Sequence, residues 1–113
     1  MYKRGNKEYL LDIYNACNQI LKYTKGINKR EFMENEEKQD AIVRNLEILG
    51  EAVKNISETF REKHPEVQWK EIARTRDKLI HFYFGVDYDV VWDIITVDIP
   101  RLKKQVKIII EKE

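Results

Sequence analysis

The sequence predicts an all-α fold: an antiparallel up-and-down four-helix bundle with one short extra helix, formed by a single domain over residues 1–113. Two observations predict it. Apolar residues recur at steps of three and four along most of the chain, which is the period of a helix with one buried face. The chain also contains only four glycines and two prolines, so the many turns of an all-β fold are not expected.

The first predicted helix covers residues 7–25. Its apolar stripe consists of Leu10, Ile13, Tyr14, Cys17, Ile20 and Leu21. Gly26 is expected to end this helix, and Asn28 is expected to cap a short turn through Phe32.

A long second helix is predicted over residues 35–63. Its start is acidic, at Glu34, Glu36 and Glu37, which suits the positive end of a helix dipole. One face carries Ala41, Ile42, Asn45, Leu46, Leu49, Val53, Ile56 and Phe60. The helix is expected to end before His64 and Pro65, because a residue that precedes proline disfavours helical geometry.

The last part of the chain predicts two further helices joined by a short turn. One covers residues 68–83 and ends at Gly85. Asp87 or Asp89 is expected to cap a turn over residues 90–95. Asp98 is expected to cap the final helix, whose first turn tolerates Pro100. The buried side of this helix consists of Leu102, Val106, Ile109 and Ile110.

Charge and cysteine content limit the possible functions. The 21 Lys and Arg residues nearly balance the 20 Asp and Glu residues, so the net charge of +1 excludes capture of nucleic acid or a membrane by the overall field. A polyanion site must therefore be a local patch. Cys17 is the single cysteine, which favours a reducing compartment. No stretch approaches the roughly 18 apolar residues of a membrane span, so a cytoplasmic protein without membrane association is expected.

One segment, residues 74–83, combines several chemically active side chains. It contains Arg74, Arg76, His81 and Tyr83. An imidazole can shuttle protons near neutral pH, and a guanidinium can stabilise charge that develops on a phosphate. These groups could cleave RNA without a metal, and no metal-ligand spacing is present. From residue types alone, a structural role for the same histidine and arginines stays open.

The spacing of Arg76 and His81 restricts how they could act together. Five residues on an ideal helix separate them by about 140°, so one straight helix would not direct both side chains at one small group. Either the helix loosens near His81, or a second copy supplies the missing groups in a symmetric dimer.

These residues resemble a known family. Arg76, His81 and Tyr83 fit the R-x4-H-x-Y motif of HepT-like proteins, which belong to the HEPN superfamily of small helical ribonucleases. The resemblance covers nearly the whole chain and includes residues 39–52, 69–73, 84–87, 91–92 and 98–102.

The resemblance implies a homodimeric ribonuclease toxin of a type VII toxin–antitoxin pair. Its partner would be an MntA-like nucleotidyltransferase that transfers AMP from ATP to Tyr83, and the toxin itself would need no cofactor. Arg76 and His81 would form the catalytic pair, with RNA as the substrate. Asp77 would orient that pair. The residues that would line the dimer cleft are Arg44, Asn45 and Glu51.

Two other interpretations of the segment remain. The bundle could be a non-catalytic dimeric adaptor that binds a nucleotide or docks a minimal nucleotidyltransferase. It could also be a helical assembly protein with a buried polar cluster. Loss of RNA cleavage at an unchanged melting temperature, after substitution of Arg76 or His81, is expected only for the enzyme.

Overall fold

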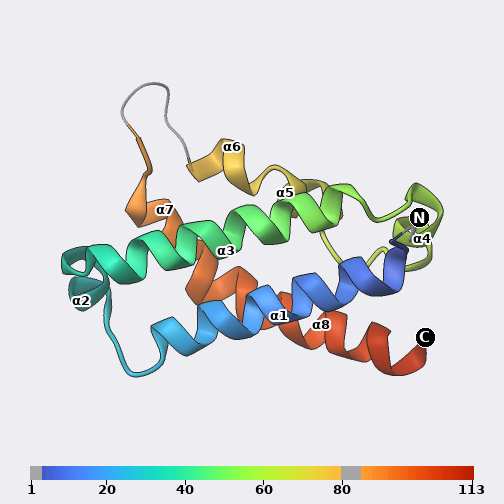
Figure 1. Ribbon diagram of the computed structural model, residues 1–113, viewed down its shortest axis with the longest axis horizontal. Coiled ribbons are helices and arrows are strands. Elements are labelled where there is room, and N and C mark those ends of the chain that lie inside the picture. Colours follow the sequence, from blue (N-terminus) through green and yellow to red (C-terminus); the bar gives the residue numbers. More distant parts are fainter. Residues whose placement is uncertain (1–3, 80–84) are drawn as a thin grey trace.

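The computed structural model describes residues 4–79 and 85–113, and this part of the chain is helical as predicted (Figure 1). The helices, in chain order, are α1 (Asn6–Thr24), α2 (Lys29–Glu34), α3 (Glu36–Lys54), α4 (Glu58–Lys63), α5 (Trp69–Ala73), α6 (Thr75–Leu79), α7 (Tyr88–Asp93), the π-helix η1 (Ile94–Asp98) and α8 (Ile99–Lys112). The expectation of an all-α fold is confirmed for these residues.

Three long helices form the body of the molecule. α1 runs antiparallel to α3 and packs against both α3 and α8 (Figure 1). Each contributes fully buried aliphatic side chains to one core, such as Ile13 from α1, Leu46 from α3 and Val106 from α8. Burial of such a side chain contributes about 1.5–3 kcal/mol, so the shared core holds the three helices together.

Three predicted stop and start signals act as expected. Gly26 follows α1 with a φ of +76°, a conformation that glycine adopts without strain. The Asn28 side chain accepts a 2.8 Å hydrogen bond from the backbone N–H of Glu31 and so caps α2. At α7 the cap is Asp87 rather than Asp89, because the Asp87 carboxylate accepts from the N–H groups of Asp89 and Val90.

The prediction of one continuous helix over residues 35–63 is wrong. α3 ends at Lys54, and α4 begins after Ser57, whose hydroxyl accepts a hydrogen bond from the Phe60 N–H. The Ser57 N–H in turn donates to the side-chain oxygen of Asn6, at 3.0 Å. This N-cap and a partner from the start of the chain stabilise a break that the apolar spacing does not reveal. The expected end before His64 and Pro65 is confirmed.

The last two predicted boundaries also differ. The helix expected over residues 68–83 is divided at Arg74 into α5 and α6, and residues 80–83 lie outside the described part. Asp98 is not a cap, because its backbone is helical and its side chain makes no capping hydrogen bond. It pairs with Arg101 at 3.2 Å instead. α7 therefore continues through η1 into α8, and the wide π turn ends two residues before Pro100.

Among the helices of residues 4–79 and 85–113, none combines the length and apolar character needed to cross a bilayer.

Candidate functional site

The R-x4-H-x-Y segment begins in α6. Arg76 is the second residue of this helix, immediately after Thr75, and its backbone is described. The side chain of Arg76, and all of His81 and Tyr83, lie outside the described residues. Convergence of the imidazole and the guanidinium therefore stays a prediction. The structure describes the helices on either side of residues 80–84, which are α6 before them and α7 after them (Figure 1).

A buried threonine fixes the corner from which α6 starts. Thr75 is only 5% exposed, and its hydroxyl donates a 2.5 Å hydrogen bond to the carbonyl of Ile72 near the end of α5. The N–H of Lys78 donates to the carbonyl of Arg74, which starts the helical pattern of α6. The direction of the helix that holds Arg76 is thus set by local bonds at this corner.

The corner packs against α3 at Gly50, where there is room for a methyl group but not for a longer side chain. Gly50 is buried, and a Cβ atom at this position would stand 3.6 Å from the carbonyl oxygen of Ile72 and 3.9 Å from that of Ala73. A larger side chain would push α5, and with it α6, away from α3.

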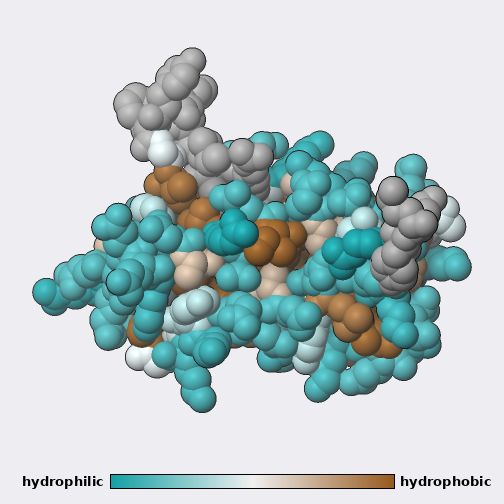
Figure 2. Space-filling view, viewed as in Figure 1, coloured by the Kyte–Doolittle hydropathy of each residue, from teal (hydrophilic) through white to brown (hydrophobic). Residues whose placement is uncertain are grey.

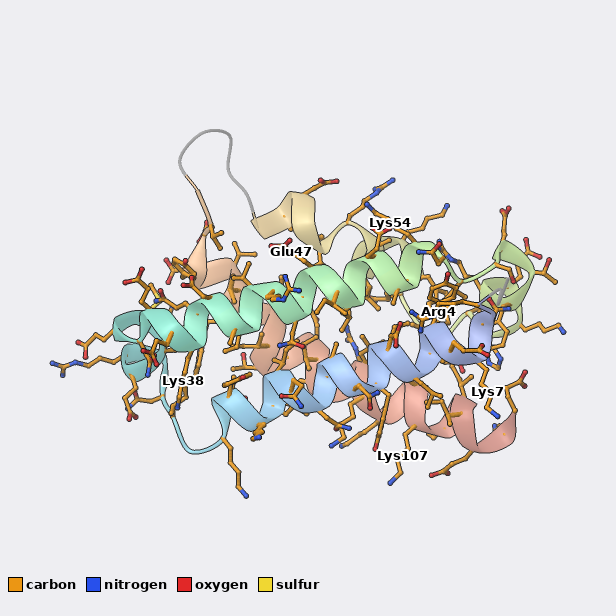
Figure 3. The ribbon with its side chains drawn as sticks, in the orientation of Figure 1. Arg4, Lys7, Lys38, Glu47, Lys54 and Lys107 are labelled. Atoms are coloured by element: carbon orange, nitrogen blue, oxygen red, sulfur yellow. The ribbon has the colours of Figure 1, made fainter. Side chains whose placement is uncertain are left out.

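A surface groove runs along α3 beside this corner. It has a volume of about 410 Å³ and is lined mainly by the α3 residues Arg44, Glu47, Ile48, Gly50, Glu51, Ala52 and Lys54, followed by Asn55. Arg4, Tyr9 and Asp12 close it from the α1 side, and Ala73 closes it at the end of α5. Figure 3 shows Arg4 at the α1–α3 seam, while Glu47 and Lys54 lie on the side of α3 that faces α5 and α6.

The groove collects some of the predicted supporting residues and not others. Arg44 and Glu51 both line it, and the assignment of this groove as the dimer cleft stays a prediction. Asn45 does not; it is half-buried, and its amide donates a 2.9 Å hydrogen bond to the carbonyl of Ala41 in its own helix. Asp77 is exposed on α6 and is not among the lining residues. Its expected role in orienting the catalytic pair is not tested.

The charged residues of α3 in the groove are positive at the two ends and negative between them. Arg44, Glu47, Glu51 and Lys54 are exposed, and within the described residues none of them forms an ion pair. Ile48 lies among them with 42% of its surface exposed. Figure 2, drawn in the same orientation as Figure 3, shows this face of the molecule as largely hydrophilic, with apolar surface near its centre. A row of charges of both signs can be complementary to a second protein surface that carries the opposite order of charges.

Glu47, Ile48 and Lys54 were missed by the sequence analysis. Their spacing of three and four residues from Arg44 and Glu51 places them on the same face of a helix, and that signal could have found them. Thr75 carries no comparable signal, because its role depends on burial at a corner between two short helices.

Two other features bear on the chemistry. Cys17 is fully buried, and burial raises the pKa of its thiol to about 12, although the charge of Lys103 lowers it in part. Such a thiol stays protonated and is no nucleophile at neutral pH. Within the described residues, no three His, Cys, Asp or Glu side chains group closely enough to hold a metal ion.

The helical fold and the R-x4-H-x-Y sequence together define the class of small helical ribonucleases. The family described as Ribonuclease HepT-like matches residues 13–109, so the chain belongs to the HepT-like ribonuclease family and is an endoribonuclease of that type.

Proteins that are similar to this chain over most of their length are also named as ribonucleases. The chain is 50% identical over 107 residues to "Putative RNase TTE0752" of Caldanaerobacter subterraneus subsp. tengcongensis, covering 95% of this chain and 96% of the relative. It is 50% identical over 101 residues to "Probable ribonuclease HepT" of Thermococcus cleftensis, covering 89% and 92%. A third relative, "Putative RNase MJ1380" of Methanocaldococcus jannaschii, is 45% identical over 109 residues, covering 96% and 100%. No solved structure matches the chain at a significant level.

Proposed function

We propose that this protein is the toxin of a type VII, HepT/MntA-like toxin–antitoxin pair and that it cleaves RNA in the cytoplasm without a metal ion. The observation that carries the proposal is the complete R-x4-H-x-Y sequence, from Arg76 to Tyr83, in a chain of the HepT-like family. The residue types supply a general base and a phosphate-stabilising cation, and the motif lacks none of its three functional positions.

The cleavage step uses the ribose 2′-hydroxyl as the nucleophile. His81 takes the 2′-OH proton, and the oxygen attacks the adjacent phosphorus. Arg76 stabilises the added negative charge of the five-coordinate phosphorus. The 5′-oxygen leaves with a proton from His81 of the partner subunit or from water. The products are a 2′,3′-cyclic phosphate and a 5′-hydroxyl end. Acid–base assistance of this kind contributes about 10²–10⁴ in rate.

The active form is a homodimer in which the α3 groove faces its copy. Along α3 the charges are positive at Arg44, negative at Glu47 and Glu51, and positive at Lys54. If two antiparallel copies of α3 meet with the two-fold axis between residues 47 and 48, Arg44 stands opposite the partner's Glu51, and the pair occurs twice by symmetry. Ile48 then lies next to the axis, where its exposed surface is covered.

The toxin is silenced by covalent modification. The Tyr83 hydroxyl attacks the α-phosphorus of ATP on an MntA-like nucleotidyltransferase, AMP is attached to the tyrosine oxygen, and pyrophosphate leaves. The added phosphodiester places a negative charge near Arg76 and His81, where it competes with the substrate phosphate for the same groups.

Cleavage of RNA by purified protein in the presence of EDTA tests the proposal. We expect cyclic-phosphate products, no cleavage of DNA because it lacks the 2′-OH, and loss of cleavage in Arg76→Ala and His81→Ala at an unchanged melting temperature. Cleavage by His81→Ala at the wild-type rate, or an absolute requirement for Mg²⁺, would contradict it. Intact-mass analysis with the nucleotidyltransferase and ATP should show added AMP in the wild type and none in Tyr83→Phe.

A further inference from the structure

Positive charge is concentrated on one helix of this nearly neutral chain. α8 contains five cations and one acid, Glu111, so it carries a net charge of +4. The whole chain has a net charge of only +1, so all other residues together carry −3. α8 is thus the kind of local patch that the overall composition does not reveal, and a local patch is what binding of a polyanion requires.

The cations lie on the side of α8 that faces away from the core. Leu102, Val106 and Ile109 are buried against the rest of the protein. The cations on the opposite, exposed side are Arg101, Lys104, Lys107 and Lys112, which together are called the α8 basic face. Lys107 points outward from the lower edge of the molecule in Figure 3.

Most of this charge is not neutralised by the protein. Arg101 pairs with Asp98 at 3.2 Å. For Lys104, Lys107 and Lys112, the described residues offer no carboxylate within ion-pair distance. Three lysines within about two and a half turns are therefore free to bind anions from solution.

The α8 basic face is connected to the helix that carries the motif. A hollow between α5–α6 and η1–α8 is lined by Lys78 of α6 on one side and by Arg101 of α8 on the other. Lys78 stands two residues after Arg76 in the chain. Glu71 and Asp98 also line this hollow, so it is not uniformly positive. The hollow nevertheless brings Lys78 of α6 and Arg101 of the α8 basic face to one part of the surface.

We propose that the α8 basic face binds the phosphates of the RNA strand on one side of the cleavage site. This inference rests on the proposed function, since it assigns a binding surface for the same substrate. Phosphates are favoured over an acidic protein because lysine is depleted at protein–protein interfaces, whereas lysines account for much of the sequence-independent affinity for nucleic acids.

Binding of a 2′-O-methyl oligoribonucleotide, which cannot be cleaved, tests this surface. The variant is Lys104→Gln with Lys107→Gln. The matched control is Lys25→Gln with Lys38→Gln, which also removes two lysines that form no ion pair within the described residues, at the α2 end of the molecule. Each lost phosphate contact makes the plot of log K against log salt concentration less steep by about 0.7. For the two lysines of the test variant the slope should therefore fall by about 1.4 in magnitude, and binding at 0.1 M salt should be roughly twentyfold weaker. The control should keep the wild-type slope.

Two results would overturn the proposal. One is an equal loss of affinity in both double variants, because then only net charge matters. The other is binding of a polyglutamate peptide that depends on Lys104 and Lys107 while binding of RNA does not, which would indicate an acidic protein partner. Because the oligonucleotide is not cut, these results are independent of catalysis. Absence of cleavage by the wild-type enzyme would instead contradict the proposed function.

Discussion

The hydroxyl of Thr75 donates a 2.5 Å hydrogen bond to the carbonyl of Ile72. Thr75 stands one residue before Arg76, the arginine of the R-x4-H-x-Y motif. Thr75 is buried, so water does not readily replace the bond. A side chain that packs inside the protein therefore controls the start of the helix that holds an expected catalytic residue.

Replacing this hydroxyl should impair both stability and cleavage. Thr75→Val keeps the shape of the side chain but leaves the Ile72 carbonyl without its side-chain partner, which costs about 1–3 kcal/mol. A shift of α6 of the order of 1 Å should lower the cleavage rate by roughly tenfold or more. Urea unfolding and single-turnover cleavage measure the two effects. Thr75→Ser, which retains the hydroxyl, should recover most of the rate. Equal rates for the valine and serine variants would show that the bond does not position α6.

Gly50 gives a second test of the same corner, with a graded series of side chains. A Cβ atom at this position lies at ordinary van der Waals distance from the Ile72 carbonyl, so Gly50→Ala should fit. It should stabilise α3 by up to about 1 kcal/mol, since alanine favours helix more than glycine does. Gly50→Leu should destabilise the protein by about 1–3 kcal/mol through overpacking against α5. Guanidinium unfolding distinguishes them, and a leucine variant as stable as the wild type would show that α5 is free to move.

The fold was predictable to the extent that it follows from local signals. The apolar period located α1 and α8, and Asn28 and Gly26 act through their own backbone neighbours. The break after α3 depends in part on a distant contact, because the Ser57 N–H donates to Asn6, 51 residues away in the chain, while the Ser57 hydroxyl that caps α4 is a local signal. Asp98 looked like a cap beside Pro100, but the π turn carries the helix through this position.

Part of the lining of the α3 groove was predictable for the same reason. Arg44 and Glu51 lie two turns apart on one helix, and they do line one groove. Asn45 is adjacent in sequence but is turned to its own backbone. The contribution of Gly50 and Thr75 depends on how α5 meets α3, which is a tertiary contact without a sequence pattern.

The buried thiol predicts a specific pH dependence of stability. The pKa of Cys17 is about 12 in the folded protein, against 9.0 for an ordinary thiol. Above pH 9 the unfolded chain loses this proton while the folded chain keeps it, so rising pH favours unfolding. Between the two pKa values the loss approaches about 1.4 kcal/mol per pH unit.

Comparison with Cys17→Ala isolates this effect from the titration of tyrosines and lysines. The variant should be less stable at pH 7, because it leaves a cavity. Its stability should nevertheless fall less steeply than that of the wild type between pH 9.5 and 10.5, by about 1 kcal/mol. If the free energy of unfolding, measured with urea, falls equally steeply with pH in the variant and in the wild type, then Cys17 ionises in the folded protein. In agreement with burial, the native thiol should react with a disulfide reagent only slowly until the protein unfolds.

The charge order on α3 predicts how the proposed dimer responds to charge reversal. Arg44→Glu places a carboxylate opposite the partner's Glu51, twice per dimer. Exposed ion pairs contribute about 0.2–1 kcal/mol each, and their replacement by repulsion at two places should weaken the dimer by roughly tenfold or more. Sedimentation equilibrium measures the dissociation constant.

The double variant Arg44→Glu with Glu51→Arg restores opposite charges in the reversed order and should recover most of the affinity. Lys54→Glu serves as the control, because the proposed axis does not place Lys54 opposite a charge of its copy. Rescue in the double variant requires that the two residues face each other across the dimer, so a double variant as weak as the single one would place the contact between subunits elsewhere.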